Sequence, residues 1–156
     1  MNATNLVRCF AQKGLTLSTA ESCTGGLIAA AITGVPGASS IFTHGFVTYA
    51  NVAKTQMLDV PEQLLIAHGA VSEPVARAMA QGAQARASTD YALSTTGIAG
   101  PDGGTTEKPV GTVWFGLAGP TGTTTYHKLF QGDRESVRLQ AVSFALALLN
   151  QQGENK

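Results

Sequence analysis

The chain has 156 residues, 44% of them hydrophobic, and its ten lysines and arginines balance its ten aspartates and glutamates. This length and composition fit one globular domain over residues 1–156 with a substantial buried core. Zero net charge, with basic residues scattered singly, argues against nucleic acid as the main partner. No apolar run approaches the roughly 18 residues that span a bilayer, and no signal-peptide core is recognisable, so we expect no membrane partner. Cys9 and Cys23 form no CxxC motif, which favours free thiols and a cytoplasmic location.

Helix and strand signals alternate through the first half of the chain. An apolar face that includes Leu6 and Phe10 predicts the first helix, and Gly14 follows it as a typical helix-ending residue. Ser72 can cap a later helix whose first turn contains Pro74. The expected elements are helix 4–13, strand 15–19, helix 24–33, strand 42–50, short helices 52–58 and 61–67, and helix 72–87.

The second half is richer in strands. The short turn 119–122 is typical of a hairpin and predicts that the strands on either side of it are antiparallel neighbours. The expected elements are strands 90–96, 110–117 and 123–130 and a long helix from 134, with a polar tail after Asn150 that should fray. Together the two halves predict a three-layer α/β/α domain with a mixed, mostly parallel sheet of about five strands.

The segment Ser18-Thr-Ala-Glu-Ser-Cys-Thr-Gly-Gly26 carries the strongest functional signal. It joins an expected strand to an apolar helix, so its turn should present free backbone N–H groups, which suit a phosphate or an oxyanion. The turn holds two potential nucleophiles, Ser22 and Cys23, beside the hydroxyl of Thr24. Ordinary helix capping favours the same residue types, so this segment alone leaves both interpretations open.

Two further loops compete for the chemistry, 49–54 after the second strand and 95–104 after the third. If the first three strands are parallel, all three loops gather at one sheet edge, where open α/β sheets bind their ligands. The chain contains no GxGxxG, no P-loop, no GxSxG and no Ser-x-x-Lys motif. His44, His68 and His127 show no metal-ligand spacing, so no metal site is expected. Lys54, in an apolar context after a strand, could be a general base if burial lowers its pKa, or an ordinary exposed helix lysine.

Several of these segments resemble one known family, and the resemblance runs from about residue 16 to 149 in order. The matching segments are Ala20-Glu-Ser-Cys-Thr-Gly-Gly26, Gly45-Phe-Val-Thr-Tyr-Ala-Asn51 with Lys54, His68-Gly-Ala-Val-Ser-Glu-Pro74, Thr96-Gly-Ile-Ala-Gly-Pro-Asp-Gly-Gly104, Lys108-Pro-Val-Gly-Thr-Val-Trp114 and Gly132-Asp-Arg134. They are similar to the CinA C-terminal domain family, whose enzymes are nicotinamide-nucleotide amidases. The resemblance implies hydrolysis of the carboxamide of nicotinamide mononucleotide to nicotinate mononucleotide and ammonia. It also implies no cofactor, and a homodimer or higher homo-oligomer. Many family members carry a larger N-terminal pyrophosphatase domain, for which this chain has no room.

By position, the resemblance assigns Ser22 as the nucleophile and Lys54 as the base, with Tyr49 between them in the hydrogen-bonded site. The residues expected around the substrate are Cys23, Thr24, Gly25, Thr96, Gly97, Gly100, Gly103, Gly104, Arg134 and Arg138. We expect oxyanion donors from the helix N-terminus after Ser22, and phosphate contacts from Arg134 and the N–H groups of 100–104. Arg138, one helical turn beyond Arg134, could share its role. Two alternatives remain: a non-catalytic nucleotide-binding module, and a hydrolase that uses Cys23.

Overall fold

The computed structural model describes residues 2–155, and a five-stranded sheet lies at its centre. The strands are β1 (Leu17–Glu21), β2 (Phe42–Val47), β3 (Tyr91–Gly97), β4 (Thr112–Gly119) and β5 (Gly122–Leu129), in the spatial order β2-β1-β3-β4-β5. β1 pairs in parallel with β2 and β3, whereas β4 is antiparallel to both β3 and β5. The mixed sheet of five strands is therefore confirmed, although parallel and antiparallel pairings are equal in number.

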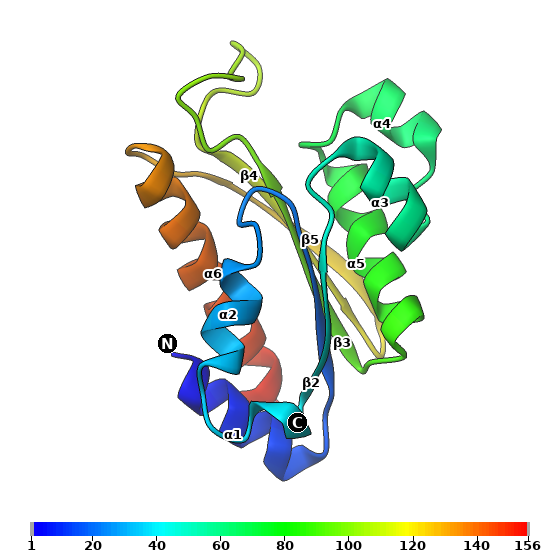
Figure 1. The fold of residues 1–156 in the computed structure, drawn as a ribbon, viewed down its shortest axis with the longest axis vertical. Helices are drawn as coiled ribbons and strands as arrows, with labels where there is room; N and C mark the ends of the chain where they lie inside the picture. Colours follow the sequence, from blue (N-terminus) through cyan, green and yellow to red (C-terminus); the bar gives the residue numbers. More distant parts are fainter. Residues whose placement is uncertain (1, 156) are drawn as a thin grey trace.

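Helices cover both faces of this sheet, as the three-layer prediction requires (Figure 1). One layer contains α1 (Ala3–Lys13), α2 (Leu27–Thr33) and α6 (Arg134–Glu154), and the other contains α3 (Asn51–Leu58), α4 (Glu62–His68) and α5 (Glu73–Ala87). A single 3₁₀ turn, η1 (Ala38–Ser40), precedes β2. None of the helices within residues 2–155 is both long enough and apolar enough to cross a membrane.

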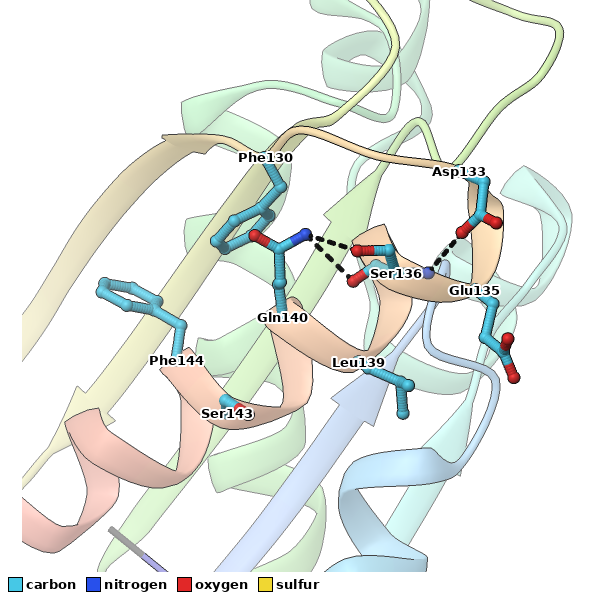
Figure 2. Close-up of a pocket in the computed structure, with 8 residues that line it drawn as sticks. All are labelled: Phe130, Asp133, Glu135, Ser136, Leu139, Gln140, Ser143 and Phe144. Atoms are coloured by element: carbon cyan, nitrogen blue, oxygen red, sulfur yellow. Dashed lines mark hydrogen bonds between the residues drawn. The ribbon is translucent and has the colours of Figure 1, made fainter.

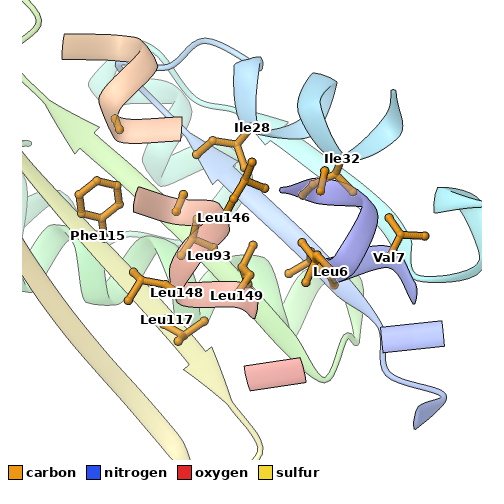
Figure 3. Close-up of a cluster of buried hydrophobic side chains, with 14 of the residues drawn as sticks. Leu6, Val7, Ile28, Ile32, Leu93, Phe115, Leu117, Leu146, Leu148 and Leu149 are labelled. Carbon is orange, nitrogen blue, oxygen red and sulfur yellow. The ribbon is translucent and has the colours of Figure 1, made fainter. Parts of the chain in front are cut away.

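Each helical layer encloses its own apolar core. The larger core lies under α1, α2 and α6 and includes Leu6, Ile28, Leu93, Phe115 and Leu149, all fully buried (Figure 3). The smaller core lies under α5 on the other face and is built around side chains such as those of Val75 and Met79. Because both faces of β1 are covered, all five of its residues are buried, including three polar ones. This interior strand is thus packed on both faces just before the turn that contains Ser22.

Several element boundaries differ from the sequence prediction: β2 ends at Val47 rather than at 50, β4 covers Thr112–Gly119 rather than 110–117, and two further differences have local reasons. The second helix begins at Leu27 rather than at 24, because Gly25 and Gly26 have φ values of +57° and +105°, outside the helical region. The first strand lies two residues later than expected. The Leu15 N–H instead bonds the Phe10 carbonyl after the αL cap at Gly14.

The polar C-terminal tail does not fray, so that expectation is wrong. α6 continues to Glu154, and Gly153 packs so closely on α1 that an added Cβ would lie 3.1 Å from Cβ of Cys9. Asn150 is fully buried: its side chain accepts a hydrogen bond from Asn5 at 2.7 Å and donates one to the Leu146 carbonyl at 2.8 Å. Polarity alone mispredicted this segment, because its polar groups are satisfied by α1 and by α6 itself.

Candidate active site

The three loops singled out in the sequence meet at one edge of the sheet. Glu21, the last residue of β1, is in register with Val47 of β2 and Thr95 of β3, so the chain leaves these parallel strands side by side. A pocket of about 290 Å³ opens there. It is lined by Ser22, Cys23, Tyr49, Asn51, Lys54, Ala70, Val71, Thr96, Gly97, Ile98, Ala99, Gly100, Asp102, Gly103 and Arg134.

Lys54 and Ser22 form a buried hydrogen-bonded pair in this pocket. The Lys54 side chain, only 1% exposed, places Nζ 3.0 Å from Oγ of Ser22. The same Nζ donates to the backbone carbonyls of Thr48 at 2.9 Å and Tyr49 at 3.2 Å. Desolvation by burial penalises the ammonium form and lowers the pKa of Lys54 from 10.5 to about 8. Lys54 is therefore a buried group poised to lose its proton, and not the exposed helix lysine of the alternative interpretation.

The three partners of Lys54 determine what its neutral form can do. A neutral amine has two N–H bonds and one lone pair. The carbonyls of Thr48 and Tyr49 can only accept, so they occupy the two N–H bonds. The lone pair then faces the Ser22 hydroxyl, the one partner able to donate. Neutral Lys54 is thus arranged to accept a proton from Ser22, and the resulting ammonium can return it.

Arg138 supports the Ser22 turn from behind. Its guanidinium donates to the backbone carbonyls of Cys23 at 3.1 Å and Thr24 at 3.4 Å, and an added Cβ at Gly25 would lie 3.4 Å from the guanidinium. Thr24 is fully buried and bonds Thr95 hydroxyl to hydroxyl at 2.8 Å. Neither Arg138, Thr24 nor Gly25 lines the pocket. This corrects the expectation that Arg138 shares the place of Arg134, because its side chain is taken up by the turn.

Glu21 binds the N-terminus of α2, where the sequence predicted that an oxyanion would bind. Its two carboxylate oxygens accept the N–H groups of Ile28 at 2.9 Å and Ala29 at 3.0 Å, and its side chain is 1% exposed. The Glu21 carboxylate therefore already caps the N-terminus of α2. The expectation that this helix end supplies oxyanion donors is wrong, because Glu21 occupies its N–H groups. The backbone N–H of Cys23 directly follows Ser22 in the chain, and within residues 2–155 no other residue accepts a hydrogen bond from it.

Cys23 is placed as a packing residue. Its side chain is 6% exposed, and desolvation raises the pKa of the thiol to about 12. An added Cβ at Gly97 would come within 3.1 Å of Sγ, so the sulfur fills the space that this glycine leaves. A thiol held in its neutral form is a poor nucleophile, which argues against the Cys23 alternative.

Tyr49 and Arg134 meet at the rim of the pocket. The Tyr49 side chain is 60% exposed and does not lie between Ser22 and Lys54, contrary to expectation. Its backbone carbonyl lies there instead, 3.2 Å from Nζ of Lys54 and 3.5 Å from Oγ of Ser22. The phenol oxygen accepts a hydrogen bond from Arg134 at 3.0 Å, and Arg134 also donates to the Gly100 carbonyl at 2.8 Å. Position in the sequence could not show which end of Tyr49 enters the site.

Most of the predicted substrate residues line the pocket, and some lining residues were not predicted. Gly104 lies outside it, behind Val110, whose backbone N would be 2.7 Å from an added Cβ. The lining residues that were missed as site residues are Asn51, Ala70, Val71, Ile98, Ala99 and Asp102. Asn51 could have been found, because it lies three residues before Lys54 on the same helix face. Ala70 could not have been found from sequence spacing, because it reaches the site only through the fold: its carbonyl accepts a hydrogen bond from the Thr96 hydroxyl at 3.0 Å.

Other hollows lack comparable chemistry. One of about 620 Å³ lies along the first half of α6, beside Phe130 and Leu139, and Gln140 donates to Ser136 there (Figure 2). No lysine, histidine or cysteine lines it. No group of three His, Cys, Asp or Glu residues within 2–155 is placed to hold a metal ion. The Ser22–Lys54 pocket is therefore the candidate active site.

Comparison with known proteins identifies the family. A model of the CinA C-terminal domain matches residues 2–152. The chain is 56% identical to the nicotinamide-nucleotide amidohydrolase PncC of Escherichia coli K12, over 90% of this chain and 86% of that protein. It is equally identical to a CinA-like protein of Anaeromyxobacter sp. Fw109-5, over 92% of this chain but only 35% of that protein. The chain thus spans about a third of the length of such longer relatives. A crystal structure of a CinA superfamily protein from Klebsiella pneumoniae superposes with a TM-score of 0.93 at 38% identity, covering 97% of this chain and 94% of that one. The chain belongs to the CinA C-terminal domain family.

Proposed function

We propose that this chain is a nicotinamide-nucleotide amidohydrolase, acting as one domain over residues 1–156, that converts nicotinamide mononucleotide and water to nicotinate mononucleotide and ammonia. The observation that carries the proposal is the 3.0 Å contact between Nζ of buried Lys54 and Oγ of Ser22 inside the pocket. The name of the Escherichia coli relative, 56% identical over most of both chains, supports this choice of substrate.

In the first half of the proposed reaction, Ser22 becomes acylated. Neutral Lys54 accepts the Ser22 proton while Oγ attacks the carboxamide carbon, and the carbonyl oxygen becomes an oxyanion. In this proposal the backbone N–H of Cys23, which no other residue within 2–155 accepts, donates a hydrogen bond to that oxygen. The C–N bond then breaks, the Lys54 ammonium protonates the leaving nitrogen, and ammonia departs. An ester between Ser22 and the nicotinoyl group remains.

In the second half, water replaces ammonia at the same base. Lys54, neutral again, accepts a proton from a water molecule that attacks the ester carbonyl. The bond between the acyl carbon and Ser22 Oγ breaks, and the Lys54 proton returns to the serine. Both halves use a single lysine, because each ends with the base in its starting state.

The pocket suits a nucleotide whose reactive amide and phosphate are at opposite ends. Its volume of about 290 Å³ is near the lower limit for ligand pockets, roughly 300 Å³. The Ser22–Lys54 pair lies at one end, and the Arg134 guanidinium lies at the rim, next to the glycine-rich loop 97–104. We propose that Arg134 and the N–H groups of this loop bind the phosphate.

A non-catalytic nucleotide-binding module is the competing function, and Lys54 argues against it. Phosphate binding needs the rim but gains nothing from a desolvated amine held against a serine hydroxyl. Burial of that amine opposes folding, since it disfavours the charged form of the lysine.

A pair of adjacent substitutions tests the proposal. We expect Ser22→Ala to lower ammonia release from nicotinamide mononucleotide by about a thousandfold or more, as removal of an activated serine does elsewhere. Cys23→Ala is the matched control, since it changes the neighbouring nucleophile in the same turn, and should retain most of the activity. An active Ser22→Ala variant beside an inactive Cys23→Ala variant would show that the nucleophile is wrongly assigned.

A further inference from the structure

We infer that the Tyr49 hydroxyl positions Arg134 and thereby sets the preference for substrates that carry an anionic group, and that it takes no part in proton transfer. The inference rests on the proposed function and deepens it. It concerns Tyr49, which contacts Lys54 with its backbone carbonyl and Arg134 with its phenol oxygen.

Tyr49 contacts the Ser22–Lys54 pair and Arg134 at the same time. Its backbone carbonyl accepts from Lys54 at 3.2 Å, and its phenol oxygen accepts from Arg134 at 3.0 Å. Tyr49 therefore connects the Ser22–Lys54 pair to the guanidinium through one residue. A ligand that reaches both must carry its anion at a matching distance from its amide.

The hydrogen bonds of the pair leave no place for the phenol in proton transfer. Nζ of Lys54 already has three partners, Ser22 and the carbonyls of Thr48 and Tyr49. The phenol is at the exposed rim and bonds a guanidinium, which stays protonated near neutral pH. A proton has no path from the Ser22–Lys54 pair through this contact.

Arg134 is held so that its free donors remain available to an anion. One terminal nitrogen donates to the Gly100 carbonyl at 2.8 Å and the other to Tyr49. A guanidinium has five N–H bonds, so these two contacts leave three for a ligand. The contacts come from two different loops and restrict an otherwise flexible, exposed side chain. Restricting it before binding lowers the entropy lost when an anion arrives.

Tyr49→Phe removes the hydroxyl and keeps the ring, so it tests the inference directly. We would measure kcat and KM for nicotinamide mononucleotide and nicotinamide riboside across pH. The ratio of kcat/KM for the mononucleotide to that for the riboside should fall roughly threefold to tenfold, the effect of losing one hydrogen bond of ordinary net strength at an exposed site, through a higher KM. The midpoint of the pH–rate profile should not move. In an Arg134→Ala background, adding Tyr49→Phe should change the ratio no further.

Two controls make the result specific. Tyr126 lies on β5 outside the pocket, and its ring packs edge-on against Phe144 of α6, so removing its hydroxyl with Tyr126→Phe should leave the ratio unchanged. In a Ser22→Ala background, which cannot turn over, Tyr49→Phe should weaken mononucleotide binding by the same factor in calorimetry. An equal loss on both substrates, a shifted pH midpoint, or an effect that persists without Arg134 would overturn the inference. If the wild-type protein releases no ammonia from either substrate, the proposed function fails instead, and the calorimetric comparison still decides the role of Tyr49.

Discussion

The pH dependence of the reaction should follow the neutral fraction of Lys54. With a pKa of about 8, Lys54 is neutral in about 1% of molecules at pH 6, about 10% at pH 7 and half at pH 8. kcat/KM should therefore rise about tenfold between pH 6 and 7, then about fivefold to pH 8, and level off above pH 9. A lysine at its ordinary value of 10.5 would be neutral in only about 0.03% of molecules at pH 7, so burial supplies about 300-fold more base.

The Lys54→Arg variant tests whether Lys54 acts as a proton acceptor or only as a fixed positive charge. The guanidinium keeps a positive charge and donors for the carbonyls of Thr48 and Tyr49, but it cannot accept the Ser22 proton near neutral pH. We expect it to be nearly as inactive as Lys54→Ala, while circular dichroism shows a folded protein and calorimetry shows mononucleotide binding. Because arginine is larger, Lys54→Met serves as a second variant without charge and should also be inactive.

Two results would refute this reasoning. Substantial activity in Lys54→Arg would mean that Lys54 acts only as a fixed charge and that another group accepts the proton. A wild-type profile that keeps rising tenfold per unit up to pH 10 would mean that burial does not lower the pKa of Lys54. Both results would be seen in assays of ammonia release from the wild-type and Lys54→Arg proteins across pH, in buffers of constant ionic strength.

Two other substitutions follow from the same site. Arg134→Ala should raise KM for the mononucleotide by about tenfold or more and change the riboside less, which parallel ammonia-release assays would measure; equal losses would mean that Arg134 does not bind phosphate. Glu21→Ala removes both acceptors of the α2 N-terminus and should lower the free energy of unfolding by about 2 kcal/mol, measured by urea denaturation; an unchanged midpoint would show that this cap is energetically neutral.

The gathering of the functional loops at one edge of the sheet was predictable, because it follows from local helix and strand patterns. Strand and helix signals alternate in the first half, and that alternation predicts parallel strands whose C-terminal ends gather the functional loops. Ser22 and Lys54 are 32 residues apart, so no spacing rule joins them, and their pairing came from the family resemblance. A homodimer and a cytoplasmic location stay predictions from the sequence.

What the sequence could not show depends on contacts across the fold. Capping rules place the helix cap at a Ser or Thr just before the helix, yet α2 is capped by Glu21, seven residues before Ile28, because two glycines fold the turn back. Arg134 and Arg138 share a helix face, and only the packing of α6 on the Ser22 turn separates their surroundings. The two arginines are distinguished by backbone carbonyls of distant segments, Gly100 for Arg134 and Cys23 for Arg138, which side-chain patterns do not reveal.

The cost of burying Lys54 connects stability with the proposed function. Within residues 2–155 neither of the two salt bridges involves Lys54, so no carboxylate compensates for its charge. Its pKa is lower in the folded chain than in the unfolded one, so the unfolded chain binds the proton more tightly. Below pH 8 this opposes folding by on the order of 3 kcal/mol, and the penalty fades as pH rises toward 10.5. A structural role would be served as well by an apolar side chain without that cost. The burial of Lys54 makes physical sense if its neutral amine is needed, as it is in the proposed mechanism, where it accepts the proton of the adjacent Ser22 hydroxyl.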